Sequence, residues 1–422
     1  MLVELRFENH RSVRDEQALT FEAASIGDDR DDRPRRVPGH DRALLPVAAV
    51  YGANASGKSN VLAALGFMRQ AVALSHRFWS PDGGVPREPF AWGARRADTS
   101  LFEVELILDG ARYAYGFVCD DTRFREEWLY AWPNGRKQVW FERDDDTFKF
   151  GEHLRGENHI VERVTRPNAL FLSAAVQMRH AQLDPIFRWF STIRTVGVAR
   201  ARRLPERPES WEQSLLNPGP VQTSLFGDDL PPPRLPEAFL NLLRSADLGI
   251  VDVKQLDDER DPSDPRRPGR FRVVVQHHTS GDDAWLPLEE ESQGTRTLFR
   301  IGPVILSALD TGGIVVVDEL EASLHPLLGL QLVKLFNDPA TNPRNAQLVF
   351  STHDTNLLGS TLGDAALRRD QVWLCEKDPE GGTRIYPLTD YKPRKAENLE
   401  RGYLQGRYGA IPFLGALVRV EA

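Results

Sequence analysis

One segment of the sequence has the residue types and spacing of a phosphate-binding loop. Residues 52–59 read GANASGKS, a complete match to the pattern G-x-x-x-x-G-K-[ST]. Glycines let the backbone wrap closely around phosphate oxygens, while the loop N–H groups and the following helix N-terminus supply positive potential. In this motif Lys58 would reach the β- and γ-phosphates, and the Ser59 hydroxyl would bind Mg²⁺. The residues that we expect to contact a nucleotide are Gly52, Ala53, Asn54, Ala55, Ser56, Gly57, Lys58, Ser59 and Asn60.

The elements around this loop are the ones that the motif needs. Residues 47–51 form a short apolar run, and residues 59–75 carry apolar side chains at helical spacing. The sequence therefore predicts a strand, a glycine loop and a helix in that order. The alternative is a glycine-rich turn that caps a helix by chance, and the flanking elements disfavour it.

An acidic pair supplies the second part of a hydrolytic site. Residues 314–317 read IVVV, four consecutive strand-forming residues, and Asp318 and Glu319 follow directly. We expect Asp318 to hold Mg²⁺, directly or through water, and Glu319 to act as the general base that polarises the attacking water. An isolated Asp-Glu pair would be a solvated surface pair, but the preceding strand and the phosphate loop favour catalysis. The chain has no Asn-Lys-x-Asp motif, so ATP is favoured over GTP.

Two further short motifs follow a recognisable order. Ser292 and Gly294 form a Ser-x-Gly element before a helical stretch, and residues 351–354 read STHD after a predicted strand. The order of these motifs resembles that of the ABC-type ATPases, including the SMC and RecF branch, in which two nucleotide domains sandwich ATP. The resemblance implies that Ser292 and Gly294 act in trans on the γ-phosphate and that His353 senses it. The alternatives are a helix N-cap at Ser292 and an ordinary polar residue at His353.

The resemblance extends over nearly the whole chain. The start resembles the N-terminal strand and turn of SMC and RecF relatives, with His10 where phenylalanine is usual. Other segments resemble the RloA or abortive-infection type of bacterial AAA-class ATP-binding proteins: LFLSAAVQ (170–177), ADLGI (246–250), ESQGTRTLF (291–299), VVDELEASLHP (316–326), STHDTNLL (351–358) and YLQGRYGAIPF (403–413). Members are often defence-associated, and related ATPase subunits act with separate nucleases or toxins in anti-phage modules.

The same resemblance implies roles for residues outside the main motifs. Arg11 is placed where it can approach the nucleotide, and Glu321, Ser323 and His325 belong to a loop at the dimer interface. A Q-loop role for Gln177 is weaker than an ordinary surface role. For the tail YLQGRYGAIPF, a brace for the ATPase fold and a partner-docking role are equally supported.

Periodicity predicts the rest of the fold. Residues 3–7 and 19–23 alternate as two half-buried strands, and residues 101–118 alternate around the turn dipeptide Asp109-Gly110. Downstream, helices near 297–309 and 327–336 alternate with strands near 314–317, 347–350, 371–375 and 383–388. The fold class that we expect is an α/β P-loop NTPase of ABC/SMC-like type, with a mixed β-sheet flanked by helices, antiparallel hairpins and a helical insertion.

We expect one ATPase head that is split by an insertion. Residues 1–75 and 246–422 would form the head, and residues 76–245, with a proline-rich linker at 203–236, would form the insertion.

Composition limits the remaining classes. The 422 residues include 53 Lys and Arg against 61 Asp and Glu, a net charge of −8, and only two cysteines, so a disulfide scaffold is excluded. A charged N-terminus and the lack of a long apolar run predict a cytoplasmic protein that does not span a membrane. The basic cluster at Arg30, Arg33, Arg35 and Arg36 favours a solvated surface over nucleic-acid binding. A second cluster at Arg200, Arg202 and Arg203 suits DNA, RNA or a protein equally.

These patterns lead to one main hypothesis and two alternatives. The main hypothesis is a Mg²⁺-dependent ATPase subunit that dimerises around ATP and serves as the sensor or motor of a bacterial anti-phage system. Too few residues follow His353 for an appended nuclease domain, so we expect a separately encoded nuclease or toxin as partner. One alternative is an ATP-stabilised scaffold that cages an effector with little turnover. The other is an SMC/RecF-like DNA-repair ATPase.

Overall fold

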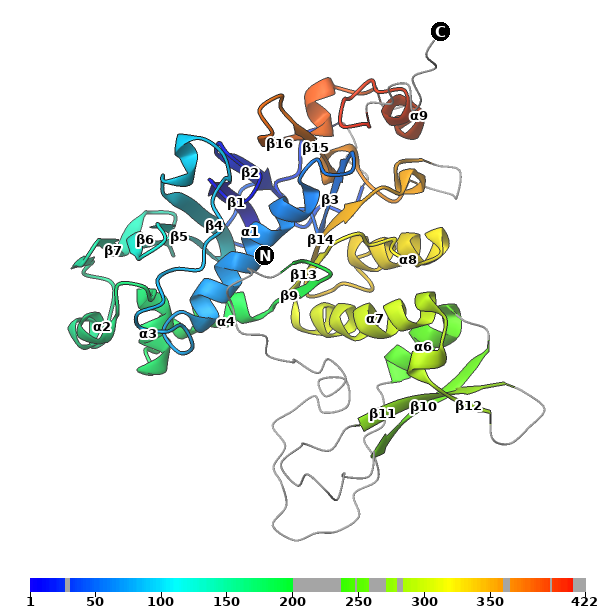
Figure 1. Ribbon diagram of the computed structural model, residues 1–422, viewed down its shortest axis with the longest axis horizontal. Helices are drawn as coiled ribbons and strands as arrows, with labels where there is room; N and C mark the ends of the chain where they lie inside the picture. The colour runs from blue at the N-terminus through cyan, green and yellow to red at the C-terminus, as the bar shows by residue number, and fades with distance from the viewer. Residues whose placement is uncertain are drawn as a thin grey trace. The chain divides into compact units, whose positions relative to one another are not determined.

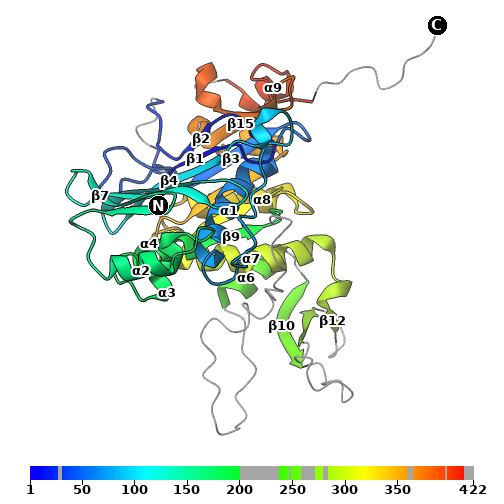
Figure 2. The ribbon, with the colours of Figure 1, turned by 60° about the vertical axis from the view of Figure 1, so that its left-hand side comes forward.

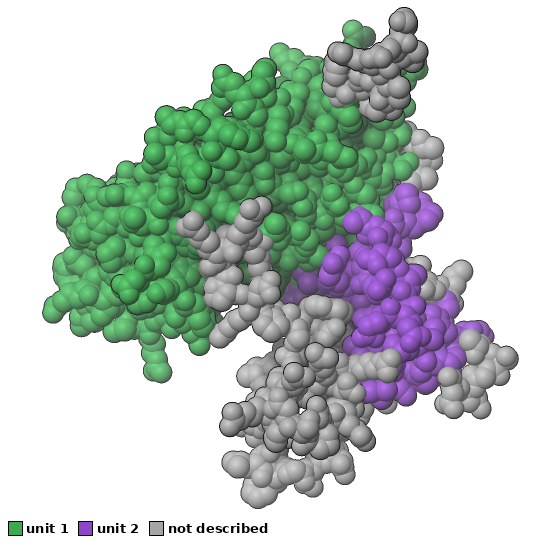
Figure 3. Space-filling model, in the orientation of Figure 1, with its two compact units in different colours: residues 1–204, 308–321, 329–422 green, residues 205–307, 322–328 purple. Residues whose placement is uncertain are grey.

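The computed structural model of the chain describes residues 1–26, 31–199, 237–246, 249–257, 271–278, 284–359, 365–394 and 397–412. The chain divides into a first unit, residues 1–204, 308–321 and 329–422, and a second unit, residues 205–307 and 322–328 (Figure 3). This division differs from the predicted domain bounds, because residues 76–204 belong to the same unit as the phosphate loop. The predicted linker 203–236 and the basic residues Arg30, Arg200, Arg202 and Arg203 lie outside the described residues.

The strand before the phosphate loop lies inside a six-stranded sheet in the first unit. The strand order is β16-β15-β3-β14-β13-β9, and all neighbours are parallel except β15 and β16. The bounds are β3 (Val47–Gly52), β9 (Ile193–Val196), β13 (Ile314–Val317), β14 (Gln347–Thr352), β15 (Val372–Lys377) and β16 (Thr383–Pro387). Every residue of β3, β13 and β14 is buried, as expected for parallel strands that are covered on both faces. The predicted strands of this region are confirmed.

A seven-stranded antiparallel sheet forms the second layer of the first unit. Its order is β2-β1-β4-β5-β6-β7-β8. The bounds are β1 (Leu2–Glu8), β2 (Gln17–Thr20), β4 (Ser100–Leu108), β5 (Ala111–Cys119), β6 (Phe124–Trp132), β7 (Gln138–Asp144) and β8 (Thr147–Phe150). Asp109 and Gly110 both have positive φ, 50° and 76°, as a primed hairpin turn requires. Both predicted hairpins are present, and β1 pairs with β4, so they form one sheet.

Helix α1 (Lys58–Leu74) lies between the two sheets and carries the phosphate loop at its N-terminus (Figures 1 and 2). It contacts β3, β14 and β9 of the six-stranded sheet. On the opposite side the ring of Phe67 packs against Phe102 and Phe117 of the antiparallel sheet, with ring centroids 4.8 and 6.3 Å apart. The other helices of this unit are α2 (Asn158–Val164), α3 (Phe171–Gln177), α4 (Asp184–Ser191) and α9 (Leu399–Leu404), with short 3-10 turns η1 (Ala94–Arg96), η3 (Thr355–Leu358), η4 (Arg369–Gln371) and η5 (Leu388–Tyr391).

The second unit contains a small antiparallel sheet and two helices that pack together. The sheet order is β10-β11-β12. Phe239 of α6 packs edge-on against Phe299 of α7. The Phe239 ring also lies close to Gly302, where a Cβ atom would be 2.8 Å from the ring. Helices α7 and α8 each run from the second unit into the first. The bounds are α6 (Glu237–Ala246), β10 (Ile250–Asp257), β11 (Phe271–His277), β12 (Trp285–Pro287), η2 (Leu288–Glu290), α7 (Gln293–Thr311) and α8 (Pro326–Asn337). In the described part of the chain, no helix has the length and apolarity needed to cross a membrane.

His10 is a buried titratable residue in the tight turn after β1. Its ring stacks near Phe67 and meets Phe102 edge-on, and only 2% of the residue is exposed. Neither ring nitrogen has a hydrogen-bond partner among the described residues. Burial, together with the neighbouring Arg11 charge, lowers the pKa of His10 from 6.5 to about 3. His10 is therefore neutral in the folded protein at any pH above that value.

The pKa of His10 predicts a loss of stability in mild acid. Below pH 6.5 the unfolded chain binds a proton at His10 that the folded chain does not bind until about pH 3. Stability is therefore full above pH 6.5 and falls as the pH falls, by about 2 kcal/mol at pH 5. His10→Phe should remove this contribution, which urea unfolding at pH 7.5 and pH 5 measures. The exposed His153, changed to Phe, is the control. An equal acid loss in wild type and His10→Phe would contradict the assignment.

Candidate functional site

The predicted site residues gather at one edge of the six-stranded sheet. Strands β3, β14 and β13 are parallel neighbours, so their carboxyl ends lie at the same edge (Figure 1). The phosphate loop follows β3, Asp318 and Glu319 follow β13, and His353 follows β14. In open α/β sheets, ligands bind outside the carboxyl ends of the strands. The topology therefore brings together three motifs that are separated by up to about three hundred residues of sequence.

Two glycines let the phosphate loop pack against β15 and β16. Gly57 has φ 111°, and a Cβ at this position would lie 2.1 Å from the Thr383 hydroxyl oxygen. A Cβ on Gly52 would lie 2.3 Å from the carbonyl oxygen of Cys375. Ala55 adopts a positive φ of 62° without being a glycine. Close packing thus requires both glycines of the motif, and the positive φ of Gly57 adds a backbone requirement at that position.

A polar network from three distant segments supports the loop. The Ser56 carbonyl accepts a hydrogen bond from the Thr383 hydroxyl at 2.8 Å, and the Cys375 thiol approaches it at 3.5 Å. The Ser12 hydroxyl lies 2.7 Å from Thr383 Oγ1 and accepts a bond of the same length from the Asn60 side chain. The side-chain amide of Asn60 thus contacts the N-terminal turn, and its expected contact with the nucleotide stays a prediction. Ser12, Thr383 and Cys375 are supporting residues that the sequence reasoning missed.

Lys58 is the buried cation of the site. Its ammonium donates to the carbonyl oxygens of Gly52 at 2.9 Å and Ala53 at 3.0 Å, and the residue is 6% exposed. Burial lowers the pKa of Lys58, while the nearby Cys375 thiol and the carboxylates of Asp318, Glu319 and Glu321 act in the opposite direction. The lysine thus interacts electrostatically with the acidic residues after β13, as the two-part motif requires.

Ser351, the fifth residue of β14, holds the acidic pair in place. Its hydroxyl donates to Asp318 Oδ1 at 2.5 Å and accepts the backbone N–H of Glu319 at 2.7 Å. Glu319 has a positive φ of 55°, which is uncommon outside glycine, and its residue is exposed. The hydroxyl of Ser351 thus satisfies the Glu319 N–H in this conformation, while Glu319 itself stays exposed. Sequence reasoning placed Ser351 only as part of the STHD motif.

Glu321 links the acidic loop to His353. One carboxylate oxygen accepts the backbone N–H of His353 at 2.6 Å, and the other is buried without a hydrogen-bond partner in the described residues. The His353 residue is exposed, yet burial of its ring and the Lys58 charge lower its pKa, against the opposing effect of the three carboxylates. The neutral imidazole is therefore favoured, and it can donate one hydrogen bond to a phosphate oxygen.

The residues present fit a nucleotide with Mg²⁺. Two buried oxygen atoms, Ser56 Oγ and one carboxylate oxygen of Glu321, have no hydrogen-bond partner within the described ranges. Loop N–H groups and Lys58 would hold phosphates, while the Ser59 hydroxyl and the Asp318 carboxylate are the hard oxygen ligands that Mg²⁺ prefers. Mg²⁺ is usually bound by one or two carboxylates plus substrate phosphates. In the part of the chain that is described, no cluster of three or more His, Cys, Asp or Glu ligands is present.

Ser292 and Gly294 lie in the second unit, at the start of α7. Ser292 is exposed, and its hydroxyl accepts the backbone N–H of Thr295 at 3.1 Å, as an N-cap does. A Cβ on Gly294 would lie 2.9 Å from the carbonyl oxygen of Ser323, which belongs to the same unit. His325, also in this unit, is exposed. Ser292 thus acts as the N-cap of α7, and its role in trans on a second nucleotide stays a prediction.

Arg11 and Gln177 do not contact the phosphate loop through any described hydrogen bond. The Arg11 guanidinium pairs with Glu88 at 2.7 Å and donates to the Ala199 carbonyl at 2.9 Å. Its approach to the nucleotide therefore stays a prediction that would require this pair to open. Gln177 is exposed at the end of α3, in agreement with an ordinary surface role.

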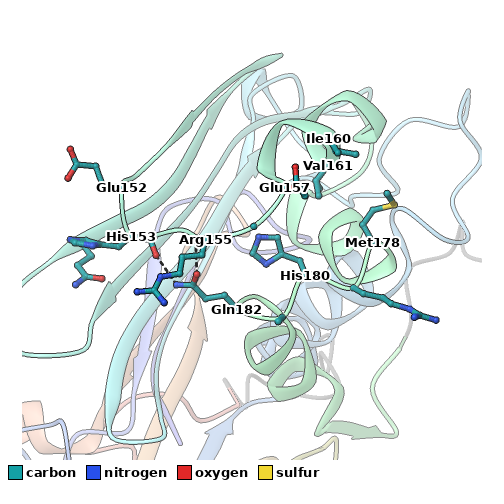
Figure 4. Close-up of a pocket in the computed structure, with 13 residues that line it drawn as sticks. Glu152, His153, Arg155, Glu157, Ile160, Val161, Met178, His180 and Gln182 are labelled. Atoms are coloured by element: carbon teal, nitrogen blue, oxygen red, sulfur yellow. Dashed lines mark hydrogen bonds between the residues drawn. The ribbon is translucent and has the colours of Figure 1, made fainter.

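A hollow of about 920 Å³ lies elsewhere in the first unit, beside α2 and α3 (Figure 4). The Gln182 amide donates to the His153 carbonyl and accepts the Arg155 N–H, at 3.0 and 2.8 Å. The His180 ring nitrogens bond to Asn158 and to the Leu183 N–H, at 3.0 and 3.3 Å. These polar groups are already engaged, so they do not define a ligand, and no residue of the phosphate loop lines the hollow.

Comparison with known proteins identifies one family. A family model described as "AAA domain, putative AbiEii toxin, Type IV TA system" matches residues 47–359, more than half of the chain. The matched range begins at β3 and ends after η3, so it includes the phosphate loop, Asp318, Glu319 and His353. No curated protein matches the chain.

The contacts of Ser351 predict that its hydroxyl contributes both to the stability of the fold and to Mg²⁺-dependent nucleotide binding. Ser351→Ala should leave the Glu319 N–H without its acceptor and free the Asp318 carboxylate, at a cost of about 1–3 kcal/mol in unfolding free energy. Ser173→Ala is the matched control, because the Ser173 hydroxyl likewise accepts one backbone N–H, that of His76 at 3.2 Å. Both variants should lose stability in urea unfolding, but only Ser351→Ala should weaken Mg²⁺-dependent binding of a fluorescent ATP analogue. Unchanged binding in Ser351→Ala would contradict the role.

Proposed function

The chain belongs to this family of AAA domains, and we propose that it is a Mg²⁺-dependent ATPase with the dimeric architecture of ABC and SMC-like proteins. The observation that carries the proposal is that the phosphate loop and the Asp318–Glu319 pair both follow the carboxyl ends of parallel strands in one sheet, on either side of β14. A phosphate loop alone would support nucleotide binding. The exposed carboxylate of Glu319 beside it supports hydrolysis, because a general base must reach the attacking water.

Each residue of the site has a distinct task in this proposal. The loop N–H groups and Lys58 bind the phosphates and offset their negative charge, while Ser59 and Asp318 would hold Mg²⁺, which neutralises charge that develops on the phosphate oxygens. Glu319 accepts a proton from the water that attacks the γ-phosphorus. His353, neutral and exposed, donates a hydrogen bond to the γ-phosphate.

The dimer part of the proposal rests on Ser292. Its hydroxyl is at the N-terminus of α7, a helix of 19 residues, where backbone N–H groups and the helix dipole favour an anion. The residue is exposed, so a γ-phosphate held by a second copy can reach it. ATP would then join two copies of the chain.

The description of the matched family supports a defence context. It names an AbiEii toxin and a type IV toxin–antitoxin system. On this basis the ATPase is the sensor or motor of an abortive-infection module and acts with a separately encoded toxin or nuclease. The net charge of −8 favours a protein effector over DNA as the main partner. A scaffold that binds ATP with little turnover, and a DNA-repair ATPase, are the alternatives that turnover measurements separate.

Glu319→Gln should stop turnover and retain ATP. The amide keeps the size of the side chain but cannot take a proton, so phosphate release should fall by at least about 100-fold. Binding of labelled ATP should remain, and light scattering with ATP and Mg²⁺ should show an accumulated dimer. Glu152→Gln, which changes an exposed carboxylate away from the phosphate loop, is the matched control and should behave as wild type.

Three results would lead to other conclusions. Phosphate release at the wild-type rate by Glu319→Gln would show that Glu319 is not the general base. A wild-type chain that forms a stable ATP-bound assembly with negligible turnover would favour the scaffold. Strong stimulation of hydrolysis by DNA, without a defence phenotype in infected cells, would favour DNA repair.

A further inference from the structure

The C-terminal segment 397–412 packs onto the loop that follows His353. Its helix α9 contacts η3, the short turn that begins two residues after His353. Tyr403 and Tyr408 of this segment are 6% and 1% exposed, so the segment has aromatic residues inside the fold. The sequence left a brace and a docking role equally open for these residues, and these contacts support the brace.

Tyr51 connects the phosphate loop to the loop after His353. It is the residue before Gly52 and is completely buried. Its hydroxyl donates a hydrogen bond of 2.9 Å to the carbonyl oxygen of Asp354, the residue after His353. One buried side chain therefore fixes the distance between the start of the phosphate loop and the backbone that carries His353.

Tyr403 and Glu400 of α9 secure this connection from the other side. The Tyr403 ring meets the Tyr51 ring edge-on with centroids 5.6 Å apart, and its own hydroxyl donates to the Ala410 carbonyl at 3.1 Å. The Glu400 carboxylate accepts the Thr355 hydroxyl at 3.2 Å. A Cβ on Gly359 would lie 2.4 Å from the same carboxylate, so this end of η3 is tightly packed as well.

The segment is itself anchored to the edge of the six-stranded sheet. The Tyr386 hydroxyl of β16 donates to the Tyr408 carbonyl at 3.0 Å, and the Tyr408 hydroxyl donates to Glu397 at 2.6 Å. The Glu376 carboxylate of β15 accepts the Ala410 N–H at 3.2 Å. These bonds hold the residues that follow α9 against strands β15 and β16, which also support the phosphate loop through Cys375 and Thr383.

The turn around His353 has little freedom of its own. The Asp354 N–H donates to the Thr352 hydroxyl at 2.9 Å, and the Asp354 carboxylate accepts the Asn356 N–H at 3.0 Å. The His353 N–H is bound by Glu321. The Asp354 carbonyl is the next backbone carbonyl after that of His353, and it accepts the hydrogen bond of Tyr51. The orientation of the exposed His353 side chain thus depends on Tyr51 and Glu321 together.

We propose that Tyr51 is a positioning residue for His353 and that the C-terminal segment, through Tyr403 and Glu400, is the brace that holds Tyr51 and η3 in place. This inference rests on the proposed ATPase function for its catalytic consequence. Tyr51 contacts neither nucleotide nor reacting atoms; it acts by keeping His353 at a fixed distance from the phosphate loop. Loss of its hydroxyl should therefore slow turnover without weakening ATP binding.

Tyr51→Phe tests this directly, because it keeps the ring and removes only the hydroxyl. The Asp354 carbonyl loses its donor, so backbone amides of residues 353–358 should exchange with deuterium roughly tenfold faster, the equivalent of one buried hydrogen bond. The kcat for ATP should fall by a similar factor, while KM stays unchanged. The full-length chain is used throughout, and melting temperatures verify that each variant folds.

Tyr115→Phe is the control. It likewise removes only the hydroxyl of a completely buried tyrosine, one that donates to the Glu127 carboxylate at 2.9 Å in the antiparallel sheet, outside the C-terminal segment and the loop after His353. Exchange in 353–358 and kcat should therefore remain at the wild-type values. Unchanged exchange and kcat in Tyr51→Phe would overturn the inference, as would an equal effect of both variants. If the wild-type chain hydrolysed no ATP while Tyr51→Phe still accelerated exchange in 353–358, the proposed function would fail and the positioning contact would stand.

Discussion

The parallel register of β3, β14 and β13 is the constraint on which the site depends. Because these strands run in the same direction and are hydrogen-bonded neighbours, the phosphate loop, the acidic pair and His353 emerge at one edge. Every residue of these strands is buried, so a shift of their pairing would draw flanking charged residues such as Asp318 into the core and would be strongly disfavoured. The stability of the core and the geometry of the site therefore have the same origin.

Charge balance at this edge follows from that arrangement. Lys58 is buried and would be costly to keep charged alone, and the carboxylates of Asp318, Glu319 and Glu321 favour its charged form. The same carboxylates would repel the phosphates of a nucleotide without a cation between them, which agrees with the expected requirement for Mg²⁺. Ser351 and Tyr51 support this arrangement. The Ser351 hydroxyl accepts the N–H of Glu319, and the Tyr51 hydroxyl donates to the carbonyl of the residue that follows His353.

Sequence patterns predicted the local elements well and the supporting contacts poorly. The strand, loop and helix around residues 52–59, both hairpins and the strand before Asp318 have periodicity or turn residues that can be recognised locally. Ser12, Thr383 and Tyr51 have no such signal, because they act through hydrogen bonds to residues far away in the sequence. The pairing of β1 with β4 is also a long-range contact, and it joins residues 76–204 to the N-terminal strands within the first unit.

The central claim is that the residues at the carboxyl ends of β3 and β13 form an ATPase site. The most direct measurement is phosphate release from excess ATP with Mg²⁺, by the purified full-length chain and by Lys58→Ala. We predict many turnovers per wild-type chain and release at the background level for Lys58→Ala, because the buried ammonium that would hold the phosphates is gone. Equal phosphate release by the two proteins would contradict the account.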